Sequence, residues 1–281
     1  MIPLVRKLAI TLGAVDQPGK RKVHLAPIPR LGGVGIYIGF FLSLFLIIWA
    51  YHAYELGYFF RPLITGATIL LLVGIIDDTY GMQPPIKLFL QCLAAIVTYS
   101  LGVRVEFFSS PWGGIFQVPA FISMLITVLW IVGLANTINL VDGIDGLAAG
   151  ITLIAAFTLF IVAVILKRYE VAVLAFTLCG TTLGFLRYNF SPASIFMGDT
   201  GSMLLGYFLA CISVLGVLKS SATLALAVPL LALGVPLLDT VAAIVRRVKQ
   251  NRHIFWADDK HLHHRLLALG FSQRQAVFLI Y

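Results

Sequence analysis

The sequence has 281 residues, of which 60% are hydrophobic and 11% are charged. A soluble domain has about 25% charged residues and cannot bury so much apolar side chain in one core, so the composition excludes a soluble protein and indicates an integral membrane protein. The formal net charge of +8 is mostly explained by membrane topology, and we expect no nucleic-acid partner.

Apolar runs of roughly 17–25 residues, the length that crosses a bilayer, recur along the chain. They predict spans at about 33–52, 60–76, 86–102, 119–136, 147–166, 170–187, 202–218 and 222–245. Residues 1–13 look like the end of a further helix and residues 271–281 like the first half of another, and both look incomplete, as in a fragment or a gene model that starts late and stops early. We therefore expect an all-α fold in a single domain of residues 1–281, a polytopic bundle of about ten transmembrane helices in a lipid bilayer.

The connections between the spans alternate between two sides of the membrane. Most of the 20 lysines and arginines fall in or next to one set of connections, formed by the first residues of the chain and by residues 14–32, 77–86, 136–146, 188–201 and 246–270. Positive charge stays on the cytoplasmic side, so this set is predicted to face the cytoplasm. Every aspartate also lies in or next to this set, and every glutamate in or next to the other. Carboxylates brought to one surface by several connections indicate a bound cation.

Asp77 and Asp78 end an apolar run at the cytoplasmic face. Adjacent residues of a helix point about 100° apart, so the two carboxylates are expected to have different roles. The alternative is a merely hydrated helix end, although the helix dipole disfavours acids at a C-terminus.

Between two apolar runs, four polar residues recur at every third position: Asn136, Asn139, Asp142 and Asp145. In a straight helix the nine-residue separation would turn about 900° and place the first and last on opposite faces. Gly143 and Gly146 are therefore expected to break or tighten the helix, so that the polar groups converge. The exposed amides would also suit phosphate oxygens, and an Asx-rich turn without function is the alternative.

Asp199 lies in the segment Ile195–Ser202, where the next helix begins. Gly198 and Gly201 allow close backbone approach. Asp199 could serve a bound ion, or it could cap the helix together with its hydroxyl neighbours. The motif alone leaves both interpretations open.

Three histidines and an arginine occur within five residues of the most basic cytoplasmic loop: His261, His263, His264 and Arg265. They could ligate zinc, but no cysteine lies nearby to complete a structural zinc site. Donors to phosphate are the favoured interpretation, with a solvated loop as the alternative. In the loop of residues 16–33, Lys20, Arg21 and Lys22 could contact anionic lipid headgroups, whereas His24 and the prolines argue for a shaped loop.

Carboxylates and amides for Mg²⁺, together with Lys, Arg and His for phosphates, describe phosphoryl transfer. Mg²⁺ usually takes one or two protein carboxylates and completes its shell with waters and phosphate oxygens, and such sites act mainly by positioning and charge neutralisation. An ion-coupled transporter is the alternative class. Transporter sites usually lie near the midplane of repeated halves, whereas here nearly all acids are predicted at the cytoplasmic ends and no repeat is visible.

Taken together, these segments resemble the polyprenyl-phosphate N-acetylhexosamine-1-phosphate transferase family, glycosyltransferase family 4, and within it the bacterial WecA and TagO branch that uses UDP-N-acetylglucosamine. The motifs follow the family order: Arg21–His24, Pro27–Gly33, Asp77–Asp78 with Lys87 and Gln91, Asn136–Gly146, Met197–Ser202 and His261–Arg265. The phospho-MurNAc-pentapeptide transferases of the same family carry three consecutive histidines and a Pro-Thr-Met-Gly-Gly loop. The His-Leu-His-His and Pro-Ile-Pro-Arg stretches of this chain favour a UDP-HexNAc donor, with the pentapeptide donor as the alternative.

The resemblance implies transfer of HexNAc-1-phosphate, first of all GlcNAc-1-phosphate, from a UDP-sugar to undecaprenyl phosphate, which releases UMP and begins surface-glycan synthesis. It implies Mg²⁺, with Mn²⁺ as a substitute, held by Asp199 and Asn139. It implies that Asp77 is the base or the orienting residue for the lipid phosphate, with orientation favoured because that phosphate is already largely ionised. It also implies that other acids organise metal and nucleotide: Asp78, Asp142 and Asp145. The histidines His261, His263 and His264 would hold the diphosphate. The remaining expected substrate contacts are Lys87, Asn136, Asn189, Phe196, Arg265, Arg21, His24 and Arg30, with Asn189 and Phe196 where the family holds uracil. The implied location is the bacterial plasma membrane with a cytoplasmic active site, and a homodimer is compatible with it.

Overall fold

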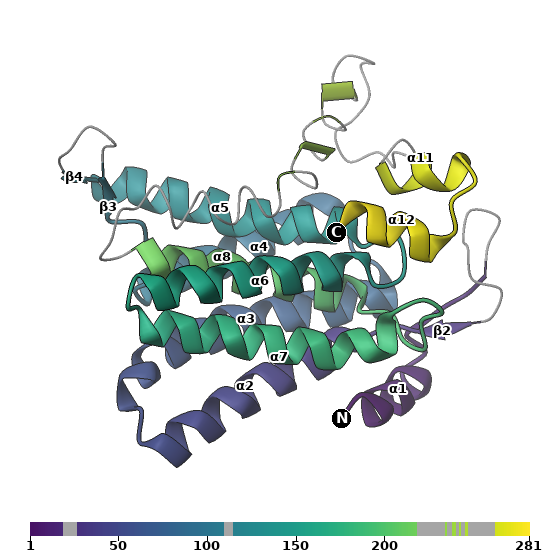
Figure 1. The fold of residues 1–281 in the computed structure, drawn as a ribbon, viewed down its shortest axis with the longest axis horizontal. Helices are drawn as coiled ribbons and strands as arrows, with labels where there is room; N and C mark the ends of the chain where they lie inside the picture. The colour runs from purple at the N-terminus through teal and green to yellow at the C-terminus, as the bar shows by residue number, and fades with distance from the viewer. Residues whose placement is uncertain are drawn as a thin grey trace.

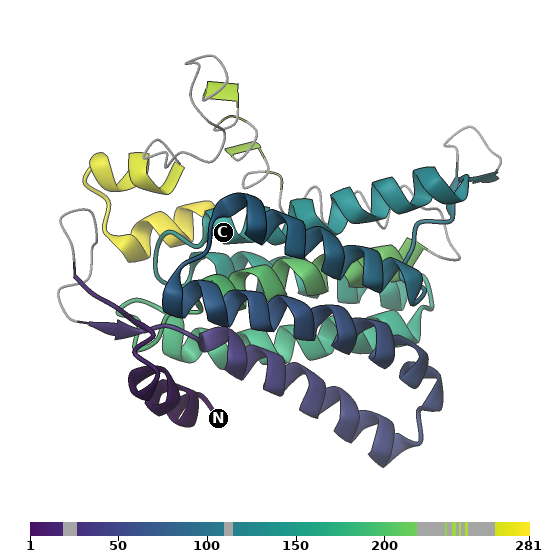
Figure 2. The same ribbon diagram turned by 180° about the vertical axis from the view of Figure 1, so that it is seen from behind.

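Long helices run side by side between two ends of the molecule in the computed structural model (Figures 1 and 2). The structure describes residues 1–18, 27–109, 115–217, 234, 238–239, 242, 245–246 and 262–281. The long helices are α2 (Gly32–Tyr51), α3 (Tyr54–Tyr80), α4 (Pro84–Ser100), α5 (Ala120–Val141), α6 (Leu147–Ile165), α7 (Tyr169–Asn189) and α8 (Gly198–Val217). The all-α membrane fold is therefore confirmed.

Short elements lie at the two ends of the bundle. The first end carries α1 (Ile2–Thr11), the antiparallel strands β1 (Val15–Asp16) and β2 (Ile28–Pro29), α11 (Leu262–Ala268) and α12 (Gln273–Ile280), as Figure 1 shows. The other end carries the hairpin of β3 (Phe107–Ser109) and β4 (Ile115–Gln117), in which Phe108 pairs with Phe116.

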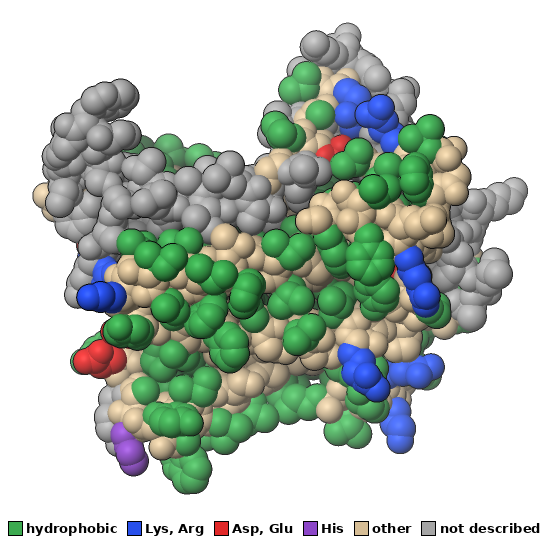
Figure 3. Space-filling view, viewed as in Figure 1, with side chains coloured by type: hydrophobic (Ala, Val, Ile, Leu, Met, Phe, Trp, Pro, Cys, Tyr) green, Lys and Arg blue, Asp and Glu red, His purple; other side chains and the backbone are tan. Residues whose placement is uncertain are grey.

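Six described helices are long and apolar enough to cross a membrane: α2, α3, α5, α6, α7 and α8. Helix α4, with 17 residues, runs between the same two ends. The expected total of about ten spans is not confirmed, because α1 and α12 are short in the described chain and the span expected at 222–245 lies almost wholly outside the described residues. Apolar side chains cover the long faces of these helices, as Figure 3 shows for one side.

Helix α8 forms the centre of the bundle and contacts α2, α3, α5, α6 and α7. Small residues let the neighbouring backbones approach it closely, as is common between membrane helices. A Cβ on Gly206 would overlap the backbone of α5, and a Cβ on Gly33 would overlap the backbone at the start of α8. The start of α8 is thereby packed closely against α2, and its middle against α5.

Two helices are longer than the apolar runs predicted. Helix α3 continues through Asp77 and Asp78, and α5 continues through Asn136 and Asn139, which were expected in connections. The polar residues stay helical because their side chains find partners inside the protein, so they need not leave the helix to reach water.

Candidate active site

Asp239 apart, the described aspartates are at the first end of the bundle, where α3, α5 and α7 finish and α4, α6 and α8 begin: Asp16, Asp77, Asp78, Asp142, Asp145 and Asp199. The glutamates Glu55, Glu106 and Glu170 are at or beside the opposite end. This separation agrees with the alternation predicted from the sequence. The predicted acidic residues therefore share one surface of the molecule.

Lys87, in the first turn of α4, connects two carboxylates from different helices. Its ammonium group lies 2.8 Å from Asp77 Oδ2 of α3 and also donates a hydrogen bond to Asp199 Oδ2 of α8. The side chains of Lys87 and Asp77 are each 13% exposed, so water screens the attraction only in part. The three residues, expected to bind lipid phosphate, other substrate groups and metal, form one charged cluster.

Asp78 points away from this ion pair and closes the N-terminus of α8. Its Oδ1 accepts a hydrogen bond from the Asp199 amide at 2.9 Å, and its Oδ2 accepts from the amide and the hydroxyl of Thr200 at 3.0 and 2.6 Å. These amides have no partner within the helix, and the helix dipole favours a carboxylate here. The two adjacent aspartates thus have different contacts, as their angular separation predicted. Asp78 supplies the helix cap that the sequence offered as one of two alternative roles for Asp199 and its neighbours.

The two asparagines of α5 face this cluster. Asn139 donates from Nδ2 to Asp199 Oδ1 at 2.9 Å and to Ser202 Oγ at 2.8 Å. Asn136 donates to Gln91 Oε1 at 2.6 Å, and the buried Gln91 amide reaches the sulfur of Met203 at 3.0 Å. Asn139 and Asp199, the predicted metal ligands, are therefore in contact, whereas Asn136 contacts Gln91.

The helix breaks after Val141, as the glycines predicted. Gly146 has a φ of 82°, a left-handed conformation that favours glycine, and α6 begins at the next residue. Asp145 turns away from the cluster and accepts a hydrogen bond from the Ala193 amide at 3.0 Å. The polar groups therefore converge only in part.

Asp142, at the end of α5, remains close to the other carboxylates. Burial and the charges of Asp199, Asp78 and Asp145 raise the pKa of Asp142 well above its usual range, and the Arg30 guanidinium lowers it only partly. Arg30 is itself paired with Asp16. The electrostatic environment of this turn is therefore negative among the described groups and favours a cation.

Asn189, expected to contact the nucleotide, is 98% buried and links two loops. Its Oδ1 accepts from the Gly146 amide at 3.2 Å and its Nδ2 donates to the Ile195 carbonyl at 3.1 Å. The half-buried Phe196 is held by its backbone, which pairs with Pro29 and Gly32. These contacts tie the loop before α8 to β2, and a role in nucleotide binding stays a prediction.

Some predicted residues cannot be placed in this cluster. Arg21, His24 and His261 lie outside the described residues, as do the side chains of His263 and His264, whose backbones belong to α11. Arg265 is exposed on the same helix.

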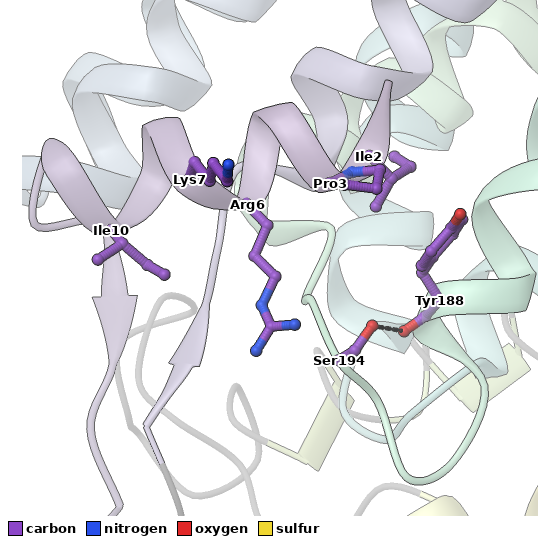
Figure 4. Close-up of a pocket in the computed structure, with 7 residues that line it drawn as sticks. All are labelled: Ile2, Pro3, Arg6, Lys7, Ile10, Tyr188 and Ser194. Atoms are coloured by element: carbon purple, nitrogen blue, oxygen red, sulfur yellow. Dashed lines mark hydrogen bonds between the residues drawn. The ribbon is translucent and has the colours of Figure 1, made fainter.

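A separate cavity of about 330 Å³ lies between α1 and the loop after α7 (Figure 4). Arg6 extends from α1 toward Ser194, and Tyr188 lines the opposite side together with that loop. None of the predicted site residues lines this cavity. The structure thus adds a hollow that the sequence did not indicate, on the α1 side of the bundle end.

The charged cluster has the donors that a Mg²⁺ site with phosphate ligands needs. Among the described residues no three His, Cys, Asp or Glu side chains form a metal cage. Mg²⁺ does not require such a cage, because it commonly takes one or two carboxylates and fills its shell with waters and phosphate oxygens. Asp199 and Asn139 lie beside more carboxylates than cationic side chains, and this arrangement fits the pattern.

Fold and site together define a polytopic membrane protein with an acidic cluster and a lysine at one end of its helix bundle. Residues 60–217 match the model of the family described as Glycosyl transferase family 4, and the chain belongs to this family.

Curated relatives extend the similarity over nearly the whole chain. A "Probable undecaprenyl-phosphate N-acetylglucosaminyl 1-phosphate transferase" of Bacillus subtilis is 41% identical over 279 residues, which cover 99% of this chain and 76% of the relative. A "Decaprenyl-phosphate N-acetylglucosaminephosphotransferase" of Mycobacterium leprae is 40% identical, with coverage of 99% and 76%. An "Undecaprenyl-phosphate alpha-N-acetylglucosaminyl 1-phosphate transferase" of Escherichia coli is 28% identical, with coverage of 98% and 75%. The predicted family is confirmed, and these names give no support to the transporter alternative.

Proposed function

We propose that this protein transfers GlcNAc-1-phosphate from UDP-GlcNAc to undecaprenyl phosphate, or to a closely related polyprenyl phosphate, at the cytoplasmic face of a bacterial plasma membrane. The observation that carries the proposal is the Asp77–Lys87–Asp199 cluster with Asn139 at one membrane face, in a chain whose relatives are named as transferases of this kind. A site at the membrane face suits a soluble donor and a lipid acceptor.

In the proposed reaction, an oxygen of the lipid phosphate bonds to the sugar-bearing phosphorus of the donor. The bond from that phosphorus to the bridging oxygen breaks, and UMP leaves with this oxygen. The lipid phosphate is largely ionised at neutral pH, because the second pKa of a phosphate monoester is about 6. Asp77 is therefore assigned to orienting the acceptor through Lys87 and not to removing a proton. Lys87 places a positive charge where phosphate oxygens of both substrates meet.

Mg²⁺ is the proposed cofactor, with Mn²⁺ as a substitute, and would be held by Asp199 with Asn139. When bound it would neutralise the charge that develops on the phosphate oxygens during transfer. Asn139 and Lys87 fix the Asp199 carboxylate from two sides, and Asp78 fixes the backbone of the same residue. Asp199 is thus oriented before any substrate arrives, which is the condition for electrostatic catalysis.

The proposal is tested by incubating the purified chain in lipid with UDP-GlcNAc, undecaprenyl phosphate and MgCl₂. We expect UMP and a lipid-linked sugar in equal amounts, both lost when EDTA is added. Asp199→Asn should abolish turnover while the protein stays inserted and folded. Absence of product with every UDP-HexNAc donor would refute the proposed function, and full activity in Asp199→Asn would remove that residue from the site.

A further inference from the structure

Helix α12 lies at the first end of the bundle (Figure 1), where one of its ends contacts the acidic turn of residues 142–146 and the other contacts the loop before α8. At its C-terminal end, the Tyr281 hydroxyl donates a hydrogen bond to the Gly146 carbonyl at 2.6 Å. The Tyr281 ring covers Gly150, where a Cβ would overlap the ring. At the other end, Arg274 Nε donates to the Ser191 carbonyl at 2.9 Å. The helix therefore bridges the acidic turn and the loop before α8.

The contact at Gly146 completes the fixation of this turn. The Gly146 amide donates to Asn189, and the neighbouring Asp145 accepts from the loop before α8. Both of these contacts come from the α7 side of the turn. Tyr281 approaches from α12, so the peptide groups around Gly146 are held from two directions.

The polar contact is added to an apolar interface that docks α12 by itself. Ala276 and Val277 are fully buried, and the Phe278 ring lies 5.8 Å from that of Phe190. Ser272 and Gln275 form a capping box at the start of the helix. Removing the Tyr281 hydroxyl alone should therefore leave α12 in place.

We propose that Tyr281 is a positioning residue, which holds the turn bearing Asp142 and Asp145 in register with the loop before α8 through its hydrogen bond to Gly146. The inference rests on the proposed function, in which this turn organises the donor nucleotide. Helix α12 follows α11, which carries the backbones of His263 and His264, so the same contact ties the histidine segment to the acidic turn. Burial raises the pKa of Tyr281 to about 12, and the hydroxyl keeps its proton at working pH.

Tyr281→Phe tests the inference, because it removes the hydroxyl and keeps the ring. We expect the KM for UDP-GlcNAc to rise by about two- to tenfold, the size of one hydrogen bond, while the KM for undecaprenyl phosphate is unchanged. Tyr99→Phe is a matched control, since Tyr99 donates a similar bond to the Ala120 carbonyl at 3.0 Å near the other end of the bundle. A change in Tyr281→Phe that is confined to stability, or equal for both substrates, would overturn the inference.

A second measurement does not depend on turnover. Hydrogen exchange in the segment 142–150 should be faster in Tyr281→Phe than in wild type and unchanged in Tyr99→Phe; equal exchange in all three proteins would overturn the inference. Gly150→Ala should reproduce the effect by displacing the ring, and should add nothing in a Tyr281→Ala background; additive effects would argue against a shared contact. If the wild-type protein makes no product but hydrogen exchange is still faster in Tyr281→Phe, the contact is supported and only the proposed function is refuted.

Discussion

The adjacent residues Asp77 and Asp78 provide a test of the structure, because the same isosteric substitution should mainly reduce stability at Asp78 and mainly reduce activity at Asp77. Asp78 accepts three hydrogen bonds at the start of α8. In Asp78→Asn, one acceptor oxygen becomes an NH₂ group, so at least one amide of Asp199 or Thr200 faces a donor in place of an acceptor. Asp77→Asn leaves Lys87 with Asp199 as its partner.

The magnitudes follow from these contacts. A buried donor without an acceptor costs about 1–3 kcal/mol, and loss of the charge at the helix N-terminus costs about 0.3–1 kcal/mol more. Weaker repulsion with Asp142 offsets part of this, so Asp78→Asn should destabilise the protein by about 1–4 kcal/mol. Asp77→Asn weakens an ion pair whose side chains are each 13% exposed, but Lys87 keeps Asp199 as a charged partner, so the cost should be smaller, about 1 kcal/mol.

Thermal unfolding with a thiol-reactive dye measures this difference, since Cys179 and Cys211 are buried and react only on unfolding. We expect a clearly lower melting temperature for Asp78→Asn, a small change for Asp77→Asn, and the larger loss of specific transferase activity per folded molecule in Asp77→Asn. Thr200→Val, which removes one of the three bonds, should have an intermediate stability. Equal destabilisation by the two asparagine variants would refute the assignment of Asp78 as the cap of α8.

Three further predictions concern the same end of the bundle. Gly33→Ala should destabilise the protein by about 1–3 kcal/mol, because the new Cβ would overlap the backbone of α8. Gly57→Ala, which has open space around it, should not destabilise the protein. Thermal unfolding measures both variants. Lys87→Gln should abolish transfer and make the melting temperature rise with MgCl₂ more than in wild type, with NaCl of equal ionic strength as the control, because a divalent ion can replace the ammonium group between two carboxylates. The pKa of Asp142 is raised in the folded protein, so ionisation of Asp142 lowers the stability of the wild type at neutral pH but not in acid. In EDTA, the stability of Asp142→Asn relative to the wild type should therefore increase as pH rises from about 4 to 8. A stability difference that does not change with pH would contradict this.

The helices and their polar interruptions were predictable from the sequence because both are local properties. The apolar run at 33–52 corresponds to α2, and the glycine-rich break after Val141 was expected from the change in pattern. The predicted run of 119–136 stops short of Val141, the end of α5, because Asn136 and Asn139 fall in the predicted connection of residues 136–146. Their partners, Gln91 and Asp199, are far away in sequence and keep them inside it.

The partners within the site could not be predicted, because they join helices that are distant along the chain. Nothing near Asp78 indicates that its carboxylate caps a helix beginning 120 residues later. Tyr281 lies in the segment 271–281, which the sequence predicts as the first half of a helix, and its contact with Gly146 depends on how α12 packs. Glycines such as Gly33 and Gly201 indicate that two backbones approach closely, but the sequence does not show which two helices these backbones belong to.

The balance of charge explains why such acidic groups are stable at the end of a membrane bundle. Asp78 is compensated by the α8 N-terminus, and Asp77 and Asp199 share Lys87. Asp142 lies at neither a helix N-terminus nor Lys87 among the described contacts, and burial together with repulsion from Asp199, Asp78 and Asp145 raises its pKa, which Arg30 lowers only in part. A compact divalent cation near Asp199 would relieve this repulsion, so its binding would stabilise the folded protein as well as charge the site for phosphate substrates. The proposed function thus gives the remaining negative charge a role, because the same carboxylates that repel one another in the free protein would attract the ion.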